Sequence, residues 1–128
     1  MRLLLDTHAL IWWLAADDSL SLTARNAIAD AANDIFISAA SAWEIAVKYA
    51  SGRLQLPEHP ERFVPAMREE RGFTALAVDE ESALHASRLP SLHRDPFDRL
   101  LVSQAIVHGM TILTPDPIVA RYPARTLW

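Results

Sequence analysis

The chain has 128 residues, a formal net charge of −4 and no cysteine. This length suits one domain with one hydrophobic core, and the lack of cysteine excludes disulfides, thiolate metal sites and cysteine nucleophiles. The negative charge argues against a broad basic surface that grips phosphate backbones, although the site of a nuclease can itself be acidic.

Nothing in the sequence predicts a membrane span, a leader or a second domain. The longest apolar stretch near the start, residues 9–16, is too short to cross a bilayer. Asp6 and His8 interrupt the N-terminus too early for a signal peptide. Because no repeat, low-complexity stretch or linker divides the chain, we expect a single cytoplasmic domain over residues 1–128.

Short apolar runs alternate with helical patterns along the chain. The first run, residues 2–5, predicts a buried strand that stops at Asp6, and a helix capped by Asp6 is expected over residues 7–16. Further strands are predicted at 34–38, 73–78, 110–114 and 125–127. Further helices are predicted at 22–33 (capped by Ser21), 39–52, 60–71, 79–89 and 96–109, with a short helical segment at 117–122.

This alternation predicts an α/β fold with a central, mainly parallel sheet and helices on both of its faces. Right-handed crossovers then bring the carboxyl ends of the strands to one edge. Ligands of such sheets bind outside that edge. Residues that directly follow a strand are therefore the candidates for a site.

Acidic residues from several parts of the sequence are expected at this edge. Asp6 follows the first strand, Glu44 is expected in the first turn of the helix after the second, and Asp116 follows the fourth. Asp95 and Asp98 open a late helix. Each has a structural explanation on its own: Asp6 and Asp95 as helix caps, Ser41 to Glu44 as an S-x-x-E capping box, Asp98 as a complement to the helix dipole, and Asp116 as a turn residue.

Taken together, the acids favour a metal site. Two carboxylates about 4 Å apart repel by roughly 4 kcal/mol at an effective dielectric constant of about 20, so a cluster needs a cation or bound protons. Oxygen ligands without cysteine, and without histidine at metal-binding spacing, suit Mg²⁺ or Mn²⁺. Ions held in this way serve phosphoryl transfer.

Four stretches, in order, resemble a known family: LLLDTHALIWWL, SAASAWEIAVK, HRDPFDRLLVSQA and LTPD. They are similar to motifs of the PIN-domain ribonucleases, above all the VapC-type toxins of bacterial toxin–antitoxin pairs, over nearly the whole chain. The resemblance implies a three-layer α/β/α PIN-like domain and a Mg²⁺- or Mn²⁺-dependent endoribonuclease. It also implies a small VapB-type antitoxin partner and a homodimer.

Carried over by motif, the resemblance implies that the catalytic and metal-binding residues are Asp6, Glu44, Asp98 and Asp116. Asp98 is preferred to Asp95 because the third acid of the family directly precedes an apolar and then small helical run, as in DRLLVSQA. Asp95 is left as a cap or an outer ligand.

Other polar residues near the acids carry weaker signals. His8 and His93 are expected to face solvent or the core, because a metal mechanism does not require a catalytic histidine. Three hydroxyls at strand ends can cap helices or orient a ligand water: Thr7, Ser38 and Thr114. Arg94 and Arg99 can hold an RNA phosphate or pair with Asp95.

Three rival functions remain open. A phosphatase with an aspartate nucleophile usually has a second aspartate two residues later, where this chain has His8. A receiver-like phosphorylation domain requires adjacent acids after the first strand and a lysine after a late strand, whereas Lys48, the only lysine, lies within a predicted helix. A PIN fold kept for binding alone is disfavoured by the intact acids.

Overall fold

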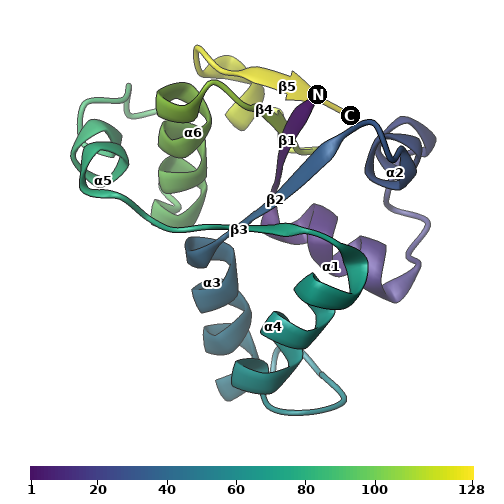
Figure 1. The fold of residues 1–128 in the computed structure, drawn as a ribbon. Helices are drawn as coiled ribbons and strands as arrows, with labels where there is room; N and C mark the ends of the chain where they lie inside the picture. Colours follow the sequence, from purple (N-terminus) through teal and green to yellow (C-terminus); the bar gives the residue numbers. More distant parts are fainter.

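The computed structural model describes residues 1–128 and contains a five-stranded sheet with helices against both faces (Figure 1). In chain order the elements are β1 (Arg2–Leu5), α1 (Thr7–Ala15), α2 (Leu22–Ala29), β2 (Asp34–Ser38), α3 (Ala39–Ala50), α4 (Pro60–Arg71), β3 (Thr74–Leu76), α5 (Glu80–Ala86), α6 (Pro96–His108), β4 (Thr111–Leu113), the 3₁₀ turn η1 (Val119–Arg121) and β5 (Arg125–Leu127). No helix is both long enough and apolar enough to span a bilayer.

All strand pairs are parallel, and the order across the sheet is β3-β2-β1-β4-β5. The chain moves outward from β1 through β2 to β3 and then returns to place β4 on the other side of β1. In the register of the central strands, Leu3 lies opposite both Ile35 and Thr111. The change of direction lies between β1 and β4, which is where open parallel sheets form their ligand crevice.

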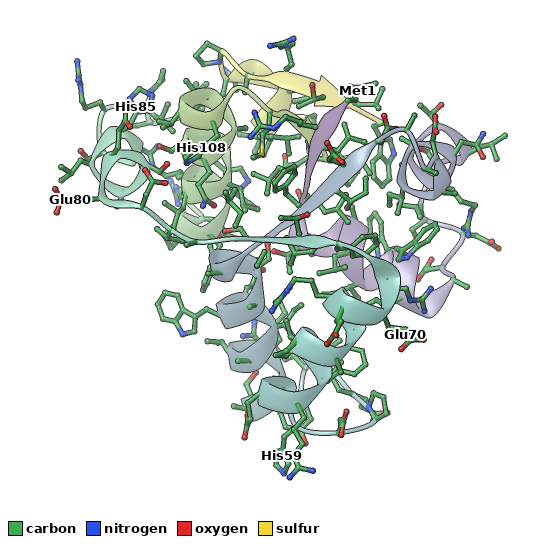
Figure 2. The ribbon with its side chains drawn as sticks, viewed as in Figure 1. Met1, His59, Glu70, Glu80, His85 and His108 are labelled. Carbon is green, nitrogen blue, oxygen red and sulfur yellow. The ribbon has the colours of Figure 1, made fainter.

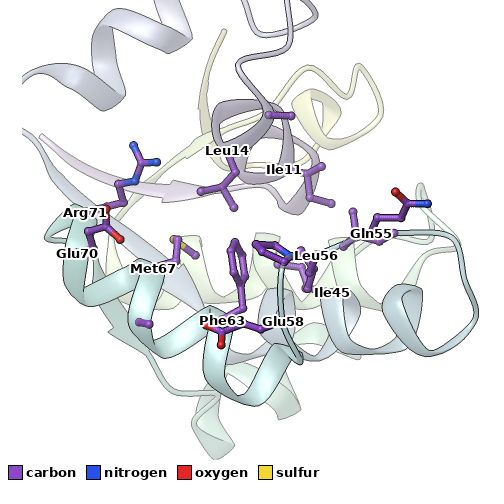
Figure 3. A pocket seen from close by; sticks show the side chains of 14 residues that line it. Ile11, Leu14, Ile45, Gln55, Leu56, Glu58, Phe63, Met67, Glu70 and Arg71 are labelled. Carbon is purple, nitrogen blue, oxygen red and sulfur yellow. The ribbon is translucent and has the colours of Figure 1, made fainter.

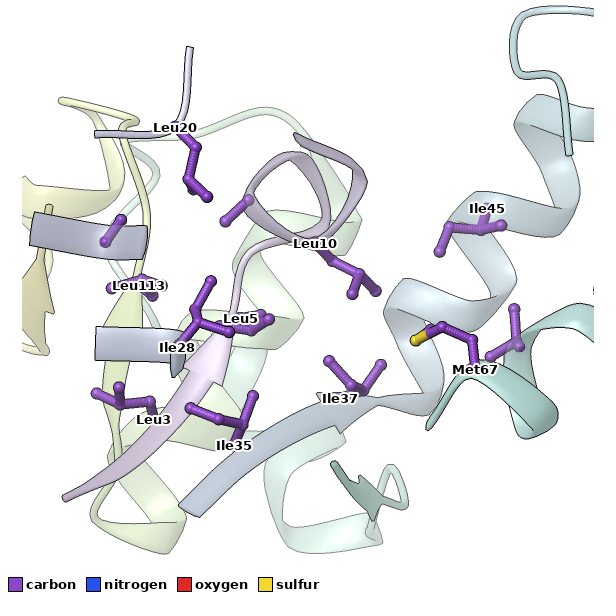
Figure 4. Close-up of a cluster of buried hydrophobic side chains, with 13 residues drawn as sticks. Leu3, Leu5, Leu10, Leu20, Ile28, Ile35, Ile37, Ile45, Met67 and Leu113 are labelled. Carbon is purple, nitrogen blue, oxygen red and sulfur yellow. The ribbon is translucent and has the colours of Figure 1, made fainter. Parts of the chain in front are cut away.

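Alternate residues of the strands enter two hydrophobic clusters, one on each face of the sheet. Leu3 and Leu5 belong to a cluster with residues of α1, α2, α3 and α4 (Figure 4). Leu4 points the other way and packs with α6 and η1. Because successive side chains of a strand point to opposite faces, a uniformly apolar run such as residues 2–5 requires cover on both sides. The predicted three-layer α/β/α fold with a parallel sheet is therefore confirmed.

Several predicted elements are longer than the observed ones. The helix predicted at 22–33 ends at Ala29, because Asp30 accepts the backbone N–H of Ala32 and the Asn33 side-chain amide donates to the carbonyl oxygen of Ala27. These local contacts compete with the helical hydrogen bonds and end the helix. The strands predicted at 73–78 and 110–114 shorten to β3 and β4, and the helix predicted at 79–89 shortens to α5.

Candidate active site at the carboxyl edge of the sheet

Asp6 lies directly after β1 and is only 3% exposed. Its Oδ1 accepts the backbone N–H of His8 at 2.8 Å and so caps α1, as predicted, while its Oδ2 accepts the hydroxyl of Thr114 at 2.7 Å. Burial opposes ionisation, but the hydrogen bonds from His8 and Thr114 outweigh it and hold the pKa of Asp6 below its ordinary value. The carboxylate that ends the first apolar run is therefore buried in its ionised form.

Asp98 and Asp116 come together on the ring of His93. The Nε2 atom of His93 lies 2.7 Å from Oδ2 of Asp116 and 3.1 Å from Oδ2 of Asp98. Asp98 sits in the first turn of α6, and Asp116 follows β4, so three segments far apart in sequence meet here. The expectation that His93 faces solvent or the core is wrong, since its ring lies between two of the acids.

The hydrogen bonds of His93 orient its ring. The backbone N–H of Asp95 donates to Nδ1 of His93 at 3.1 Å, so Nδ1 acts as an acceptor. In a neutral ring Nε2 then carries the hydrogen and donates to the acids. His93 therefore links Asp98 to Asp116.

Asp98 is the carboxyl group most affected by its neighbours. Burial, together with the nearby charges of Asp6, Asp95 and Glu44, raises the pKa of Asp98 to about 7, although His93 acts in the opposite direction. Asp6 and Glu44 therefore lie within electrostatic range of Asp98. The cluster therefore holds a proton near neutral pH that a cation would displace.

Glu44 approaches the cluster from α3 and is 6% exposed. Its Oε2 lies 3.2 Å from Nζ of Lys48, whereas its Oε1 is buried without a hydrogen-bond partner. The predicted capping box is wrong: Ser38 caps α3 by accepting the N–H of Ala40, so Glu44 lies in the second turn. A buried carboxylate oxygen without a donor is costly, and it fits a position that a cation would complete.

The donor set suits a divalent cation. Single ligand atoms from His93, Asp98 and Asp116 all lie within 4.8 Å of one another. Asp6 is joined to this group through Thr114, whose hydroxyl oxygen also accepts the backbone N–H of Asp116 at 3.1 Å. Asp6, Glu44 and Asp98 are buried, and Glu44 has an oxygen without a hydrogen-bond donor. Carboxylate oxygens are the ligands that Mg²⁺ and Mn²⁺ prefer.

Several other polar residues singled out in the sequence have structural partners, whereas Arg94 is exposed. Thr7 donates to the hydroxyl of Ser41, and Ser38 donates to the side chain of Gln104. Arg99 neither pairs with Asp95 nor faces the cluster, because its guanidinium donates to the carbonyl oxygens of residues 86, 89 and 90 and to the hydroxyl of Tyr122. Among the hydroxyls, Thr114 is the one that contacts the acids.

An apolar groove of about 430 Å³ lies beside α3 (Figure 3). Ile11 and Leu14 of α1 form one wall, and Phe63 and Met67 of α4 form the opposite wall. Ile45 also lines the groove and directly follows Glu44 in α3. The groove and the acid cluster are thus connected through one helix.

Comparisons with known proteins agree with this architecture. The PIN domain family matches residues 3–124. Ribonuclease VapC22 of Mycobacterium tuberculosis is 32% identical over 114 residues, which cover 88% of this chain and 85% of that protein. Ribonuclease VapC16 of the same organism is 41% identical over 78 residues, which cover 59% of this chain and 55% of that protein.

A solved structure shows the same fold. The crystal structure of VapBC2 from Rickettsia felis, bound to a DNA fragment from their promoter, aligns with a TM-score of 0.71 at 16% identity. The alignment covers 99% of this chain and 98% of that chain. From the family match and the similarity to VapC22, the chain belongs to the PIN-domain family, among the VapC-type ribonucleases of toxin–antitoxin systems.

Proposed function

We propose that this chain is an endoribonuclease that requires Mg²⁺ or Mn²⁺ and acts as the toxin of a toxin–antitoxin pair. The observation that carries the proposal is the gathering of Asp6, Glu44, Asp98 and Asp116 at the carboxyl edge of the sheet. Like charges gathered in this way destabilise the fold, and proteins tolerate this cost mainly at functional sites. Cleavage of a phosphodiester bond is a function that such a site can serve.

Each residue has a distinct part in the proposed reaction. A divalent cation held by these acids would supply a water of lowered pKa and offset negative charge on the phosphate. Asp6 enters the reaction already ionised, and Thr114 fixes the orientation of its carboxylate. Asp98 would lose its proton to solvent on cation binding, and Glu44 would offer its unpaired oxygen as a ligand. Lys48 balances part of the charge of Glu44.

The phosphatase alternative is disfavoured by the residue at position 8. Such enzymes usually have a second aspartate two residues after the nucleophile, where this chain has His8. A PIN fold that only binds RNA remains the alternative, and the experiment below separates it from the nuclease.

We also propose the assembly that the family resemblance implies. Residues 1–128 would form one PIN domain, since a single sheet takes strands from both ends of the chain. The domain would work in the cytoplasm as a homodimer, inhibited by a small VapB-type antitoxin. We assign the apolar groove next to α3 to that antitoxin. A segment bound there would contact Ile45, which is next to Glu44 in the same helix.

The test is RNA cleavage under metal control. We expect EDTA to abolish cleavage and Mg²⁺ or Mn²⁺ to restore it. Attack by water would leave a 5′-phosphate and a free 3′-hydroxyl, so a 2′-O-methyl group at the cut should be tolerated where it fits. A 2′,3′-cyclic phosphate product, or full activity in EDTA, would contradict the metal mechanism. RNA binding without cleavage under any metal would favour the binding module.

A further inference from the structure

Two aromatic residues lie beside the acid cluster without belonging to it. Trp43 precedes Glu44 on α3, and Phe97 precedes Asp98 on α6. Their rings meet edge to face, with centroids 5.1 Å apart and an interplanar angle of 65°. We call this pair the aromatic ledge. It joins the two helices that carry Glu44 and Asp98, and each ring is one residue away from an acid in sequence.

Packing does not account for Trp43. Its exposed fraction is 64%, while the neighbouring Glu44 is buried. A large indole left in water gains little from the hydrophobic effect, and tryptophan is usually well buried. The contact with Phe97 restricts the orientation of the ring without covering it. A fixed and exposed aromatic surface is a feature that binding sites use.

Charge alone provides little attraction for RNA here. The chain carries a net charge of −4, and the acids are concentrated at the proposed site. Lys48 is engaged with Glu44 and Arg99 donates to backbone carbonyls, so Arg94, which is exposed beside His93, is the basic residue left to meet a phosphate there. Stacking of bases on aromatic side chains depends on the π-face of the base and not on phosphate charge. A stacking residue close to the acid cluster would therefore increase the affinity of an acidic nuclease for RNA.

We propose that Trp43 stacks against an unpaired base of the RNA next to the phosphate that is cut. This inference rests on the proposed nuclease function and extends it, because it implies a preference for single-stranded RNA. A base inside a duplex has both faces covered by its neighbours, whereas an unpaired base offers a face to the indole. Phe97 acts as a positioning residue that holds the indole in place.

The experiment compares Trp43→Ala and Trp43→Phe with wild type on a labelled RNA of mixed sequence, single-stranded or annealed to its complement. Leu22→Ala, which alters an exposed apolar residue on the distant α2, is the matched control. For Trp43→Ala we expect KM on the single strand to rise between about fivefold and a hundredfold with little change in kcat. The KM of Trp43→Phe should lie between those of wild type and Trp43→Ala, and the KM of Leu22→Ala should equal that of wild type.

A second readout reports the stacking itself. In EDTA, single-stranded RNA should quench tryptophan fluorescence of the wild-type protein, and Trp43→Phe should lose most of that quenching although Trp12, Trp13 and Trp128 remain. An unchanged KM for Trp43→Ala, or equal preference for the duplex, would overturn the inference. So would a change of oligomeric mass or of antitoxin affinity alone, which would assign the ledge to a protein interface. If wild type cuts no RNA, the proposed function fails together with the inference.

Discussion

Thr114 shows how one hydroxyl group can organise two carboxylates. It donates to Asp6 and accepts from the backbone N–H of Asp116. We expect Thr114→Val to lower the free energy of unfolding by about 1–3 kcal/mol, because a buried charged acceptor loses its donor. The affinity for Mn²⁺ should also fall. Calorimetric titration with Mn²⁺ and chemical unfolding measure the two effects.

The control for this variant is Thr7→Val. Thr7 is equally buried but donates to Ser41 and not to an acid. The Thr7→Val variant should be less stable than wild type but bind Mn²⁺ with the same affinity. Equal Mn²⁺ affinities in Thr114→Val and wild type would show that Thr114 does not orient the site.

Asp98 is expected to reduce the stability of the metal-free protein. The folded protein binds the proton of Asp98 more tightly than the unfolded chain, so stability falls as pH rises from about 4 towards the folded pKa of about 7. Asp98→Asn removes this loss and should abolish RNA cleavage. In EDTA, its unfolding temperature should equal or exceed that of wild type, with a larger difference at about pH 8 than at about pH 5. Thermal melts of both proteins at the two pH values measure this difference in unfolding temperature and its sign.

Asp95 provides the contrast to Asp98. Its carboxylate caps α6 by accepting the N–H of Phe97 at 2.9 Å, as predicted. Asp95→Ala should cost about 0.5–2 kcal/mol of stability and keep substantial activity. If Asp95→Ala were inactive and Asp98→Asn active, the assignment of the third acid would be reversed.

His93 marks the limit of sequence reasoning at this scale. The caps Asp6 and Asp95 could be predicted because a cap acts on residues two positions away. His93 contacts Asp116, 23 positions away, and only the fold brings the two together. Its one local signal is its place two residues before Asp95. Because a metal-activated water needs no histidine base, we still expect His93→Ala, like His8→Ala, to retain most of the activity.

At the scale of elements, helix starts were predictable. Ser21 caps α2 as expected, and α3 begins at Ala39 directly after β2, as predicted. The pattern S-x-x-E nevertheless pointed to Ser41 as a cap, whereas Ser38 caps α3, because such a pattern can also occur inside a helix. The ends of β3 and β4 were not predictable, because a local pattern cannot reveal how far a strand extends when its neighbours in the sheet decide this.

One carboxylate, that of Asp79, links the start of α5 to the end of α6. Asp79 caps α5 through the backbone N–H and hydroxyl of Ser82, and it also lies 2.8 Å from Nε2 of His108, the last residue of α6. In Figure 2, Glu80 and His85 extend outward from α5, while His108 is on α6. The hydrogen bonds from His108 and Ser82 hold the pKa of Asp79 well below its usual range.

A lowered pKa means that this contact stabilises the fold above the unfolded pKa of about 4 and is lost as pH falls. We therefore expect amide protection in α5 to decrease below about pH 4 in wild type. Asp79→Asn, which keeps a capping side chain but not the charge, should show reduced protection at neutral pH as well. Hydrogen exchange measures this, with Glu80→Gln as control. Equal protection in Asp79→Asn and wild type would show that the charge is not needed.

At the scale of the molecule, the α/β class and the parallel sheet follow from apolar runs alternating with helical patterns. The strand order does not follow from the sequence, because a strand that is apolar on both faces can pair with any of several other strands. The convergence of the acids was predictable without that order, since all strands end at one edge. The apolar groove was not, because it is formed by α1, α4 and a loop that share no sequence pattern.

The groove leads to a prediction that separates inhibition from catalysis. Ala66 is exposed on α4 and lines the groove, so Ala66→Glu adds a charge there with little effect on the fold. We expect this variant to bind the antitoxin more weakly, because an apolar segment would have to desolvate the new carboxylate, and to cleave RNA as wild type does. Ala83→Glu, on the exposed side of α5, is the matched control.

The same antitoxin should present an arginine to the acid cluster. A guanidinium can hydrogen-bond two carboxylates at once and so compete with a metal ion. Titrating the purified complex with Mg²⁺ should therefore weaken inhibition, and an antitoxin Arg→Ala variant should inhibit less and lose that sensitivity to Mg²⁺. Inhibition that survived removal of every basic residue from the inhibitory segment would show that the antitoxin acts by covering the site and not by entering it. Unchanged antitoxin affinity in Ala66→Glu would in turn remove the groove from the interface.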